Sequence, residues 1–277
     1  MKKISNEIHE REYVLGTDAD ELFRLGLQHQ LWSGQAVRAW EKAGFSLGQN
    51  LLDVGCGPGY ATFDLAQRVG PNGHVHGIDI SKRFLAHLQF QIRARGVENI
   101  TSSLGSVEKM SFGKSSFDGA YARWVLCFVK NPDAVIKGVA RALKRGGAFV
   151  IQDYFQYESI CIAPECDVFR KVFAAIAKSW RVRGGNPDVG CFLPGILLRN
   201  GFEIREINPL VRAARPGSPL WQWPNTFFTN YIPALVNMRL LTKKTADEFN
   251  REWRKRSRDS AAFFTSPPMI EIIAVKK

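Results

Sequence analysis

The sequence lacks long apolar runs and paired cysteines, and both absences narrow its class. No uninterrupted hydrophobic stretch approaches the ~20 residues needed to cross a bilayer, and the charged first residues lack the apolar core of a signal peptide. The five cysteines are an odd number without a C-x-x-C pair, which disfavours a disulfide framework or a zinc site. We therefore expect reduced thiols, no bound metal and a cytoplasmic location.

Internal repeats and low-complexity segments are absent as well. The 277 residues are 45% hydrophobic and 23% charged, which is enough to bury a large core. Acidic residues are scarce beside basic ones, 26 against 38, and the formal net charge is +12. One soluble domain with additions fits this composition better than two equal domains.

A strand, a glycine turn and a helix follow one another near residue 50. Residues 51–54 are a short apolar run typical of a buried parallel strand, and residues 61–69 have the 3.6-residue apolar spacing of a helix packed on it. Between them, Gly55, Gly57 and Gly59 can adopt positive φ and let a ligand lie against the backbone, while the helix start offers unpaired N–H groups. The turn is therefore a predicted ligand site.

A second strand is expected at residues 75–80, and it carries Asp79 twenty residues after Gly59. A carboxylate at that point is placed to accept hydrogen bonds from two ribose hydroxyls. A dinucleotide-binding turn would need its third glycine where Tyr60 stands, which argues against NAD. The residues predict a nucleoside-binding βαβ unit.

The G-x-G-x-G spacing, with Asp53 before it in the strand, resembles motif I of the class I S-adenosylmethionine-dependent methyltransferases. Later landmarks follow in that family's order. Residues 104–108 end a third strand beside the adenine, with Ser106 where the family usually has an acid, and residues 116–126 are similar to the fourth strand beneath the transferable methyl group. The segments DVGCGPG (residues 53–59) and FDxxxxRWVL (residues 117–126) are most similar to those of the ubiquinone-methyltransferase-like small-molecule group.

This resemblance implies a Rossmann-like three-layer αβα sandwich with a seven-stranded, mostly parallel sheet and helical cap insertions. It also implies S-adenosyl-L-methionine as the cofactor, S-adenosyl-L-homocysteine as its product, and in-line methyl transfer to a small acceptor without a metal. Arg123, at the end of the fourth strand, would fork to the cofactor's carboxylate, with a structural ion pair as the alternative. The cofactor-binding residues implied are Asp53, Gly55, Cys56, Gly57, Gly59, Asp79, Ile80, Phe84, Ser106, Val107 and Arg123.

Asn131 and Pro132 predict the start of a helix, as its N-cap and first helical residue. The helix is expected to run to Leu143, and residues 144–147 to end it with a glycine C-cap before a fifth strand at 148–153. The remaining core elements expected are a helix at 193–201 and strands at 202–207 and 269–275.

Three additions to the core are expected on one face of the sheet, where they would form the acceptor pocket. Residues 1–45 are interpreted as an N-terminal helical lid, with a helix at about 18–43, and residues 46–277 as the methyltransferase domain. Cap insertions are expected at about 154–188 and 216–260, the second with two helices. An amphipathic helix in the first would bury Val168, Val172, Phe173, Ile176 and Trp180.

Aromatic residues in these additions, taken as a set, suit an aromatic or lipophilic acceptor. The alternative, stronger for any one of them, is that they pack the insertions onto the sheet. The expected substrate-binding residues are Tyr13, Tyr154, Trp180 and Trp221. His29 or Tyr154 could act as general base towards a hydroxyl acceptor, while the alternative for His29 is a surface or satisfied core histidine. Three cysteines could instead hold arsenite, the alternative to ordinary packing: Cys161, Cys166 and Cys191.

Two other functions stay open at this point, an RNA methyltransferase and a non-catalytic cofactor-binding protein. Residues 239–258 hold eight Lys/Arg against three acids, and such a face could bind RNA phosphates. Phe249 and Trp253, four residues apart, would mark the buried side of a helix whose charges are simply solvated. No nucleic-acid-binding module accompanies the charges, so a small-molecule partner is favoured; the oligomeric state is not readable.

Overall fold

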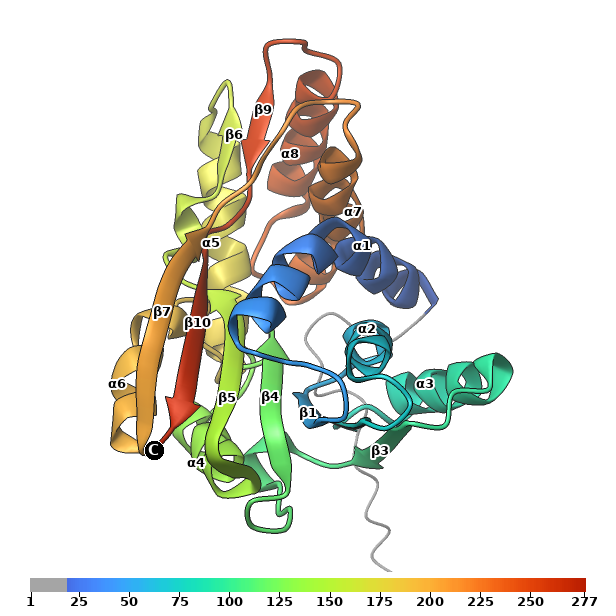
Figure 1. Cartoon of the computed structure of the whole chain (residues 1–277). Coiled ribbons are helices and arrows are strands. Elements are labelled where there is room, and N and C mark those ends of the chain that lie inside the picture. The colour runs from blue at the N-terminus through green and yellow to red at the C-terminus, as the bar shows by residue number, and fades with distance from the viewer. Residues whose placement is uncertain (1–18) are drawn as a thin grey trace, which may run out of the picture.

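The computed structural model describes residues 19–277, and a seven-stranded sheet forms its centre (Figure 1). The strands are β1 (Asn50–Val54), β2 (His74–Asp79), β3 (Ile100–Leu104), β4 (Phe117–Arg123), β5 (Leu143–Tyr154), β7 (Phe202–Leu210) and β10 (Met269–Lys276). Their order is β3-β2-β1-β4-β5-β10-β7, in which β10 runs antiparallel to both neighbours and the other pairs are parallel.

Helices cover both faces of this sheet because its strands are apolar on both sides. Neighbouring residues of a strand point to opposite faces, and both Leu51 and Leu52 are fully buried, in two separate hydrophobic clusters. One cluster contains residues of α2 (Tyr60–Val69), α3 (Lys82–Arg95) and the second half of α1 (Ala19–Lys42). The other contains residues of α4 (Pro132–Ala142) and α6 (Leu193–Arg199), and also Trp32 of α1. The expected three-layer Rossmann-like sandwich is confirmed.

The helix expected at 18–43 is present as α1, and one side of it packs on the core. Trp32, Ala36, Ala39 and Trp40 of α1 are buried, and the helix packs against α7 and α2. The rest of the segment interpreted as a lid, residues 1–18 with Tyr13, lies outside the described residues.

A helical cap lies beyond the carboxyl ends of β4 and β5 (Figure 1). It consists of α5 (Asp167–Val182), α7 (Pro219–Asn237) and α8 (Lys243–Arg256) together with a small antiparallel sheet, β6 (Cys161–Ala163), β9 (Phe263–Thr265) and β8 (Ala213–Ala214), in the order β6-β9-β8. The apolar side expected for the first cap helix is buried at all five positions on α5. The small sheet joins three segments far apart in sequence and so fixes the cap to the core.

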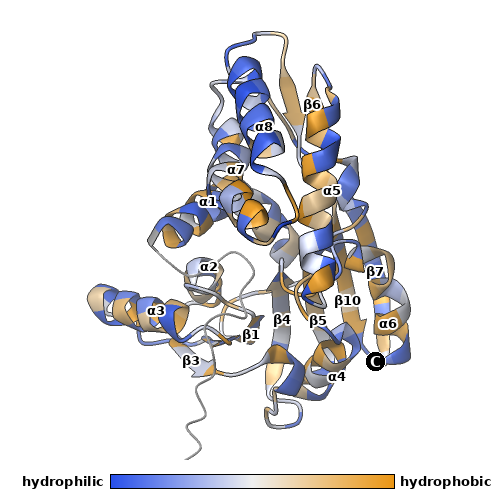
Figure 2. Ribbon diagram, turned by 180° about the vertical axis from the view of Figure 1, so that it is seen from behind, coloured by the Kyte–Doolittle hydropathy of each residue, from blue (hydrophilic) through white to orange (hydrophobic). Residues whose placement is uncertain are grey.

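Most residues along α8 are hydrophilic (Figure 2). Phe249 and Trp253 are buried as expected. Arg256 is not on the solvated face, because it is 6% exposed, donates to Glu252 at 2.8 Å and donates through Nε to the carbonyl of Pro164 at 2.8 Å. Arg256, one of the arginines counted towards a phosphate-binding face, therefore forms a structural ion pair with Glu252.

The start of the fourth helix was predicted correctly, and its end was not. Asn131 caps α4 by accepting a hydrogen bond from the amide of Ala134 at 3.0 Å. The helix stops at Ala142, and Leu143 is already extended and paired with Phe117 at the start of β5. The glycine C-cap expected at residues 144–147 is wrong: these residues form an irregularity inside β5, where Gly146 takes φ 80°.

A buried carboxylate connects β5 to the segment that follows β4. Asp153 is fully buried, and its Oδ2 accepts hydrogen bonds from the backbone amides of Val125, Leu126 and Cys127 at 3.2, 2.7 and 3.2 Å. Its Oδ1 accepts from the amide of Tyr154 at 2.8 Å. Four charge-assisted bonds to one side chain hold this turn in place.

Replacing Asp153 with alanine should lower the free energy of unfolding by about 3 kcal/mol or more, because backbone amides lose a charged partner in a dry environment. Urea denaturation followed by far-ultraviolet circular dichroism measures this change. The control is Asp247→Ala on α8, whose only described partner is the exposed Lys243 and which should change stability by under about 0.5 kcal/mol. A loss no larger than the control's would show that the Asp153 bonds do not hold the turn.

Candidate functional site

A cleft of about 960 Å³ opens at the carboxyl ends of β1, β2 and β4, and we call it the glycine-loop cleft. It brings together all of the residues implied for cofactor binding except Gly59. Those that line it are Asp53, Gly55, Cys56, Gly57, Asp79, Ile80, Phe84, Ser106, Val107 and Arg123. His29 reaches the same cleft from α1.

The three glycines of the loop serve different purposes. All have positive φ, 69° at Gly55, 55° at Gly57 and 90° at Gly59. No atom lies within 4 Å of the place where a Cβ of Gly57 would stand, so this backbone faces open space in the cleft. A Cβ at Gly59 would collide with Leu88 of α3, so Gly59 permits helix packing and does not line the cleft, contrary to the expectation.

Asp79 links the glycine loop to the end of β2. Its Oδ2 accepts from the amide of Gly57 at 2.9 Å and its Oδ1 accepts from the amide of Ser81 at 2.8 Å. Burial raises the pKa of this carboxyl, and the backbone donors oppose that shift. Since each carboxylate oxygen has a second lone pair, Asp79 can accept further hydrogen bonds from a ligand in the cleft.

Asp53, at the end of β1, is a carboxyl group that changes charge close to neutrality. It is 3% exposed and accepts a hydrogen bond from Thr62 Oγ1 at 2.7 Å. Burial raises the pKa of Asp53 to about 6, against the opposing effects of Thr62 and the Arg123 guanidinium. Its negative charge is thus available to a cationic ligand above that pH.

A chain of hydrogen bonds joins α1, β4 and α2 across the cleft. Arg123 Nη2 lies 2.9 Å from His29 Nδ1, and His29 Nε2 lies 2.9 Å from Asp64 Oδ2. Because arginine only donates, Nδ1 must be the accepting nitrogen, and Nε2 then donates to Asp64. Both ring nitrogens of His29 are therefore engaged, which disfavours the general-base role expected for it and favours the alternative of a satisfied histidine.

The other terminal nitrogen of Arg123 has no acceptor within the part of the chain that the structure describes. Nη1 is buried and makes no hydrogen bond with any described residue. The guanidinium also lies over the ring of Trp124, 4.8 Å from its centroid. A buried guanidinium donor without a partner is costly, so this edge of the cleft is suited to an anionic group.

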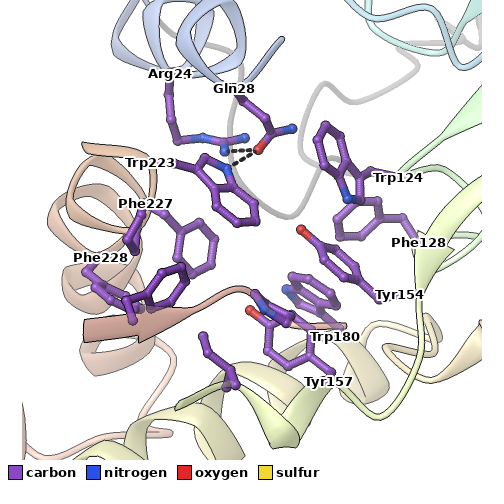
Figure 3. A pocket seen from close by; sticks show the side chains of 14 residues that line it. Arg24, Gln28, Trp124, Phe128, Tyr154, Tyr157, Trp180, Trp223, Phe227 and Phe228 are labelled. Carbon is purple, nitrogen blue, oxygen red and sulfur yellow. Dashed lines mark hydrogen bonds between the residues drawn. The ribbon is translucent and has the colours of Figure 1, made fainter. Parts of the chain in front are cut away.

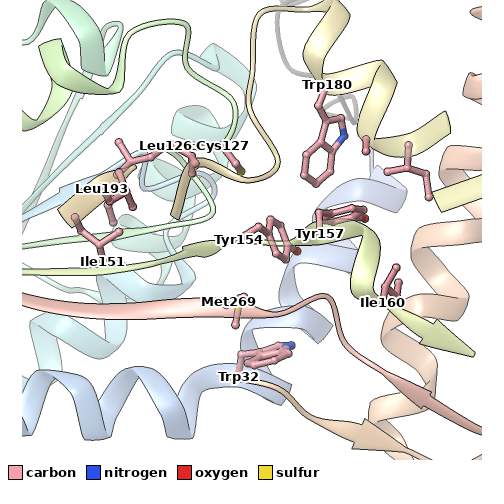
Figure 4. Close-up of a cluster of buried hydrophobic side chains, with 14 of the residues drawn as sticks. Trp32, Leu126, Cys127, Ile151, Tyr154, Tyr157, Ile160, Trp180, Leu193 and Met269 are labelled. Carbon is pink, nitrogen blue, oxygen red and sulfur yellow. The ribbon is translucent and has the colours of Figure 1, made fainter. Parts of the chain in front are cut away.

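A second cavity adjoins the cleft, and we call it the aromatic pocket (Figure 3). It is narrow, about 40 Å³, and is lined by Arg24, Gln28, Trp124, Phe128, Tyr154, Tyr157, Ile160, Trp180, Trp223, Pro224, Phe227, Phe228, Phe264 and Pro267. Gln28, Trp124 and Phe128 line both cavities, so the two are contiguous there. Tyr154 and Tyr157 approach Trp180 with ring centroids 5.7 and 4.8 Å away (Figure 4).

Two of the expected acceptor residues line the aromatic pocket, Tyr154 and Trp180. Trp221 does not, because it stacks on Trp253 of α8 at 4.6 Å and donates to Ser257 Oγ at 3.2 Å. Its role is to pack α7 on α8, which corrects the expectation. Gln28 and Trp124 line both cavities but were not expected to do so from the sequence. Their only signal was position: Gln28 lies in a predicted helix, and Trp124 directly follows a predicted strand.

Tyr154 is also not suited to accept a proton. Burial raises the pKa of its phenol well above the ordinary value, so the group stays protonated near neutrality. A neutral phenol is a hydrogen-bond donor and a poor base. This disfavours the general-base role expected for Tyr154, and the protonated hydroxyl is suited to donate a hydrogen bond.

The described part of the chain shows neither a thiol cluster nor a membrane-spanning helix. All five cysteines are free, and no group of three or more metal-binding side chains forms among residues 19–277. The arsenite-binding trio considered for Cys161, Cys166 and Cys191 is thus not assembled. Among the same residues, no helix is long and apolar enough to cross a membrane.

Comparison with known proteins shows that the chain is similar to methyltransferases. Residues 46–181 match the family model of a methyltransferase domain. A demethylmenaquinone methyltransferase from Lactococcus lactis is 33% identical over 153 residues, which cover 54% of this chain and 60% of the relative. A second, from Geobacillus stearothermophilus, is 32% identical over 44% of this chain and 51% of its own length. The chain thus spans between half and two thirds of these relatives.

Solved structures share the fold at low identity. Geranyl diphosphate C-methyltransferase from Streptomyces coelicolor A3(2), solved with S-adenosyl-L-homocysteine, has a TM-score of 0.59 and 18% identity, over 90% of this chain and 80% of its own. The [4+2]-cyclase SpnF has a TM-score of 0.54 and 20% identity, over 86% of this chain and 78% of its own. At such identities the likeness concerns the fold alone.

The raised pKa of Asp53 predicts a pH-dependent cost to stability. An acid whose pKa is 3.8 when unfolded and about 6 when folded binds more protons in the folded state between these values, so its contribution to stability falls as pH rises through that window. The stability of the wild type relative to Asp53→Asn should therefore fall by about 1 kcal/mol between pH 5 and 7.

Urea denaturation of both proteins at each pH measures this difference, because groups that the two proteins share cancel. A difference that is constant, or that grows in favour of the wild type as pH rises, would contradict the assigned pKa.

Proposed function

Because this chain belongs to the class I S-adenosylmethionine-dependent methyltransferases, we propose that it transfers a methyl group from S-adenosylmethionine to a small molecule held in the aromatic pocket. The observation that carries the proposal is the contiguity of the two cavities. The glycine-loop cleft and the aromatic pocket meet at Gln28, Trp124 and Phe128, where a methyl donor in one would face an acceptor in the other.

The side chains of the cleft fit the parts of S-adenosylmethionine. The buried Arg123 Nη1, without an acceptor, suits the carboxylate of the methionine part. Asp53 offers a negative charge for the ammonium group, and the open backbone at Gly57 leaves room for the chain between them. Asp79, already aligned by two backbone amides, suits the ribose hydroxyls.

The adenine would lie beside Ile80, Ser106 and Val107. Ser106 Oγ accepts from the amide of Glu108 at 3.3 Å, so its hydroxyl hydrogen can be donated to a ring nitrogen. This contact would take the place of the acid that the family usually has there. Phe84, at the first turn of α3, closes the same side of the cleft.

Alignment is the main demand of the chemistry. When bound, S-adenosylmethionine supplies a methyl group on a cationic sulfur, which an acceptor displaces in line. The chain's contribution is to hold the two reactants at the junction and to exclude water. We propose that α1 acts as the lid of the site, since His29 reaches the cleft from it and Gln28 lines both cavities.

A screen for methyl transfer tests the function directly. The protein is incubated with cofactor carrying a labelled methyl group and with fractions of a metabolite extract, and products are identified by mass spectrometry. The proposal expects label in a small molecule. Tight binding of S-adenosyl-L-homocysteine without turnover of any fraction would instead support a cofactor-binding protein with another role, and label in RNA alone would support the nucleic-acid alternative.

Replacing Asp79 with alanine should weaken binding of S-adenosyl-L-homocysteine at least tenfold, or ~1.4 kcal/mol, because two ribose hydroxyls lose a charged acceptor. Isothermal titration calorimetry measures the affinity, and Asp247→Ala on α8 is the matched control far from the cleft in the cap. An Asp79 variant that binds as tightly as the wild type would remove the ribose from this position.

A further inference from the structure

The polar edge of the aromatic pocket is fixed in one orientation. Gln28 Oε1 accepts hydrogen bonds from Arg24 Nη1 at 2.8 Å and from Trp223 Nε1 at 2.8 Å (Figure 3). Since guanidinium and indole groups only donate, the amide oxygen must face them. The amide nitrogen, Nε2, therefore points the other way, towards the side on which Trp124 lies, with two hydrogens to donate (Figure 3).

The guanidinium that orients Gln28 is itself held in place. Arg24 Nε and Nη2 donate to the two oxygens of Glu21, each at 2.6 Å, and both side chains are almost fully buried. This bidentate pair is neutral overall, so it positions the edge of the pocket without giving it a net charge. The donor of Gln28 is thus preorganised before any ligand arrives.

A second donor faces the same space. The hydroxyl of Tyr154 points into the pocket between Trp124 and Trp223 (Figure 3). Burial raises its pKa, so it carries a hydrogen at neutral pH. Two side chains from different elements, α1 and the end of β5, therefore present N–H and O–H groups to one region.

Among residues 19–277, no group that lines the pocket is suited to remove a proton. Among the described residues that line it, the titratable ones are Arg24, Tyr154 and Tyr157, and burial raises the pKa of both phenols. No carboxylate or imidazole of residues 19–277 lines it, and His29 in the adjoining cleft has both ring nitrogens engaged. A neutral phenol bound here would keep its proton, since an apolar environment raises the pKa of such groups further.

We infer, on the basis of the proposed function, that the acceptor is an aromatic carboxylic acid whose ionised carboxylate is held at the junction by Gln28 Nε2 and Tyr154 Oη. A carboxylate is already an anion at neutral pH, so no base is needed. In the transfer, a carboxylate oxygen lone pair forms the new C–O bond and the S–C bonding pair returns to sulfur. The positive and negative charges cancel, the product is a methyl ester, and no proton or further reactant is required.

The inference is tested by binding, separately from turnover. Protein saturated with S-adenosyl-L-homocysteine is titrated calorimetrically with four probes that share one ring system: naphthoate, naphthamide, naphthol and naphthylamine. Naphthoate should bind at least tenfold more tightly than the other three. Tyr154→Phe should weaken naphthoate binding about fivefold, the loss of one hydrogen bond to a charged group.

Gln28→Glu is the decisive variant. It keeps the acceptor for Arg24 and Trp223 but replaces the N–H donor with a second anionic oxygen, so naphthoate binding should fall at least tenfold while naphthamide binding changes less. Gln30→Glu, on an exposed part of the same helix, makes the same change of charge and is the matched control. Affinity for S-adenosyl-L-homocysteine should stay within about twofold in Tyr154→Phe and Gln30→Glu, because neither residue lines the glycine-loop cleft.

Three results would overturn the inference: a neutral probe that binds more tightly than naphthoate, an undiminished naphthoate affinity in Gln28→Glu, or no binding of naphthoate at millimolar concentration. Failure of the proposed function is distinguishable, because it would appear as absent binding of S-adenosyl-L-homocysteine or absent methyl transfer, whichever probe the pocket prefers.

Discussion

The buried carboxylate of Asp153 is the constraint on which the arrangement of both cavities depends. It binds the three amides that follow Trp124, and this fixes the direction in which the chain leaves β4. Trp124 takes a positive φ of 53°, an unfavourable conformation that the neighbouring bonds maintain. The indole of Trp124 then forms part of both cavity walls, with its N–H directed at Met269 Sδ 2.8 Å away. The boundary between the two cavities is thus set by Asp153, a side chain that lines neither of them.

Charges in the site are arranged so that each part of a ligand meets its complement. The cleft is lined by the carboxyls of Asp53 and Asp79 and by Arg123, whose Nη1 has no acceptor among the described residues, a combination suited to a zwitterionic amino acid with a ribose attached. Among residues 19–277, Arg24 is the one charged side chain that lines the aromatic pocket, and it is paired with Glu21. Such a division favours binding through preorganised hydrogen bonds, with little cost of reorientation when the reactants arrive.

The sequence was sufficient for the elements whose cause is local. The glycine loop, the strand that ends at Asp79 and the helix capped by Asn131 each depend on a few consecutive residues, and all are found where expected. Residues 144–147 were misread because two glycines after a helix suit a C-cap and a strand irregularity equally well. The β6-β9-β8 sheet was not foreseen, since strands of two or three residues give no alternation to detect.

The side-chain roles in the site that could not be predicted from the sequence depend on contacts between distant segments. His29 is a lone histidine until Arg123, 94 positions later, and Asp64 engage its two nitrogens. The amide of Gln28 is oriented by a hydrogen bond from Trp223, 195 positions away. Trp221 does not line the pocket as expected, because it stacks on Trp253. A crystal structure of the complex with S-adenosyl-L-homocysteine tests the central claim most directly. The account predicts the sulfur at the junction of the two cavities, the ligand carboxylate on Arg123 Nη1 and the ribose hydroxyls on Asp79, whereas a sulfur remote from that junction or a ribose away from Asp79 would contradict it.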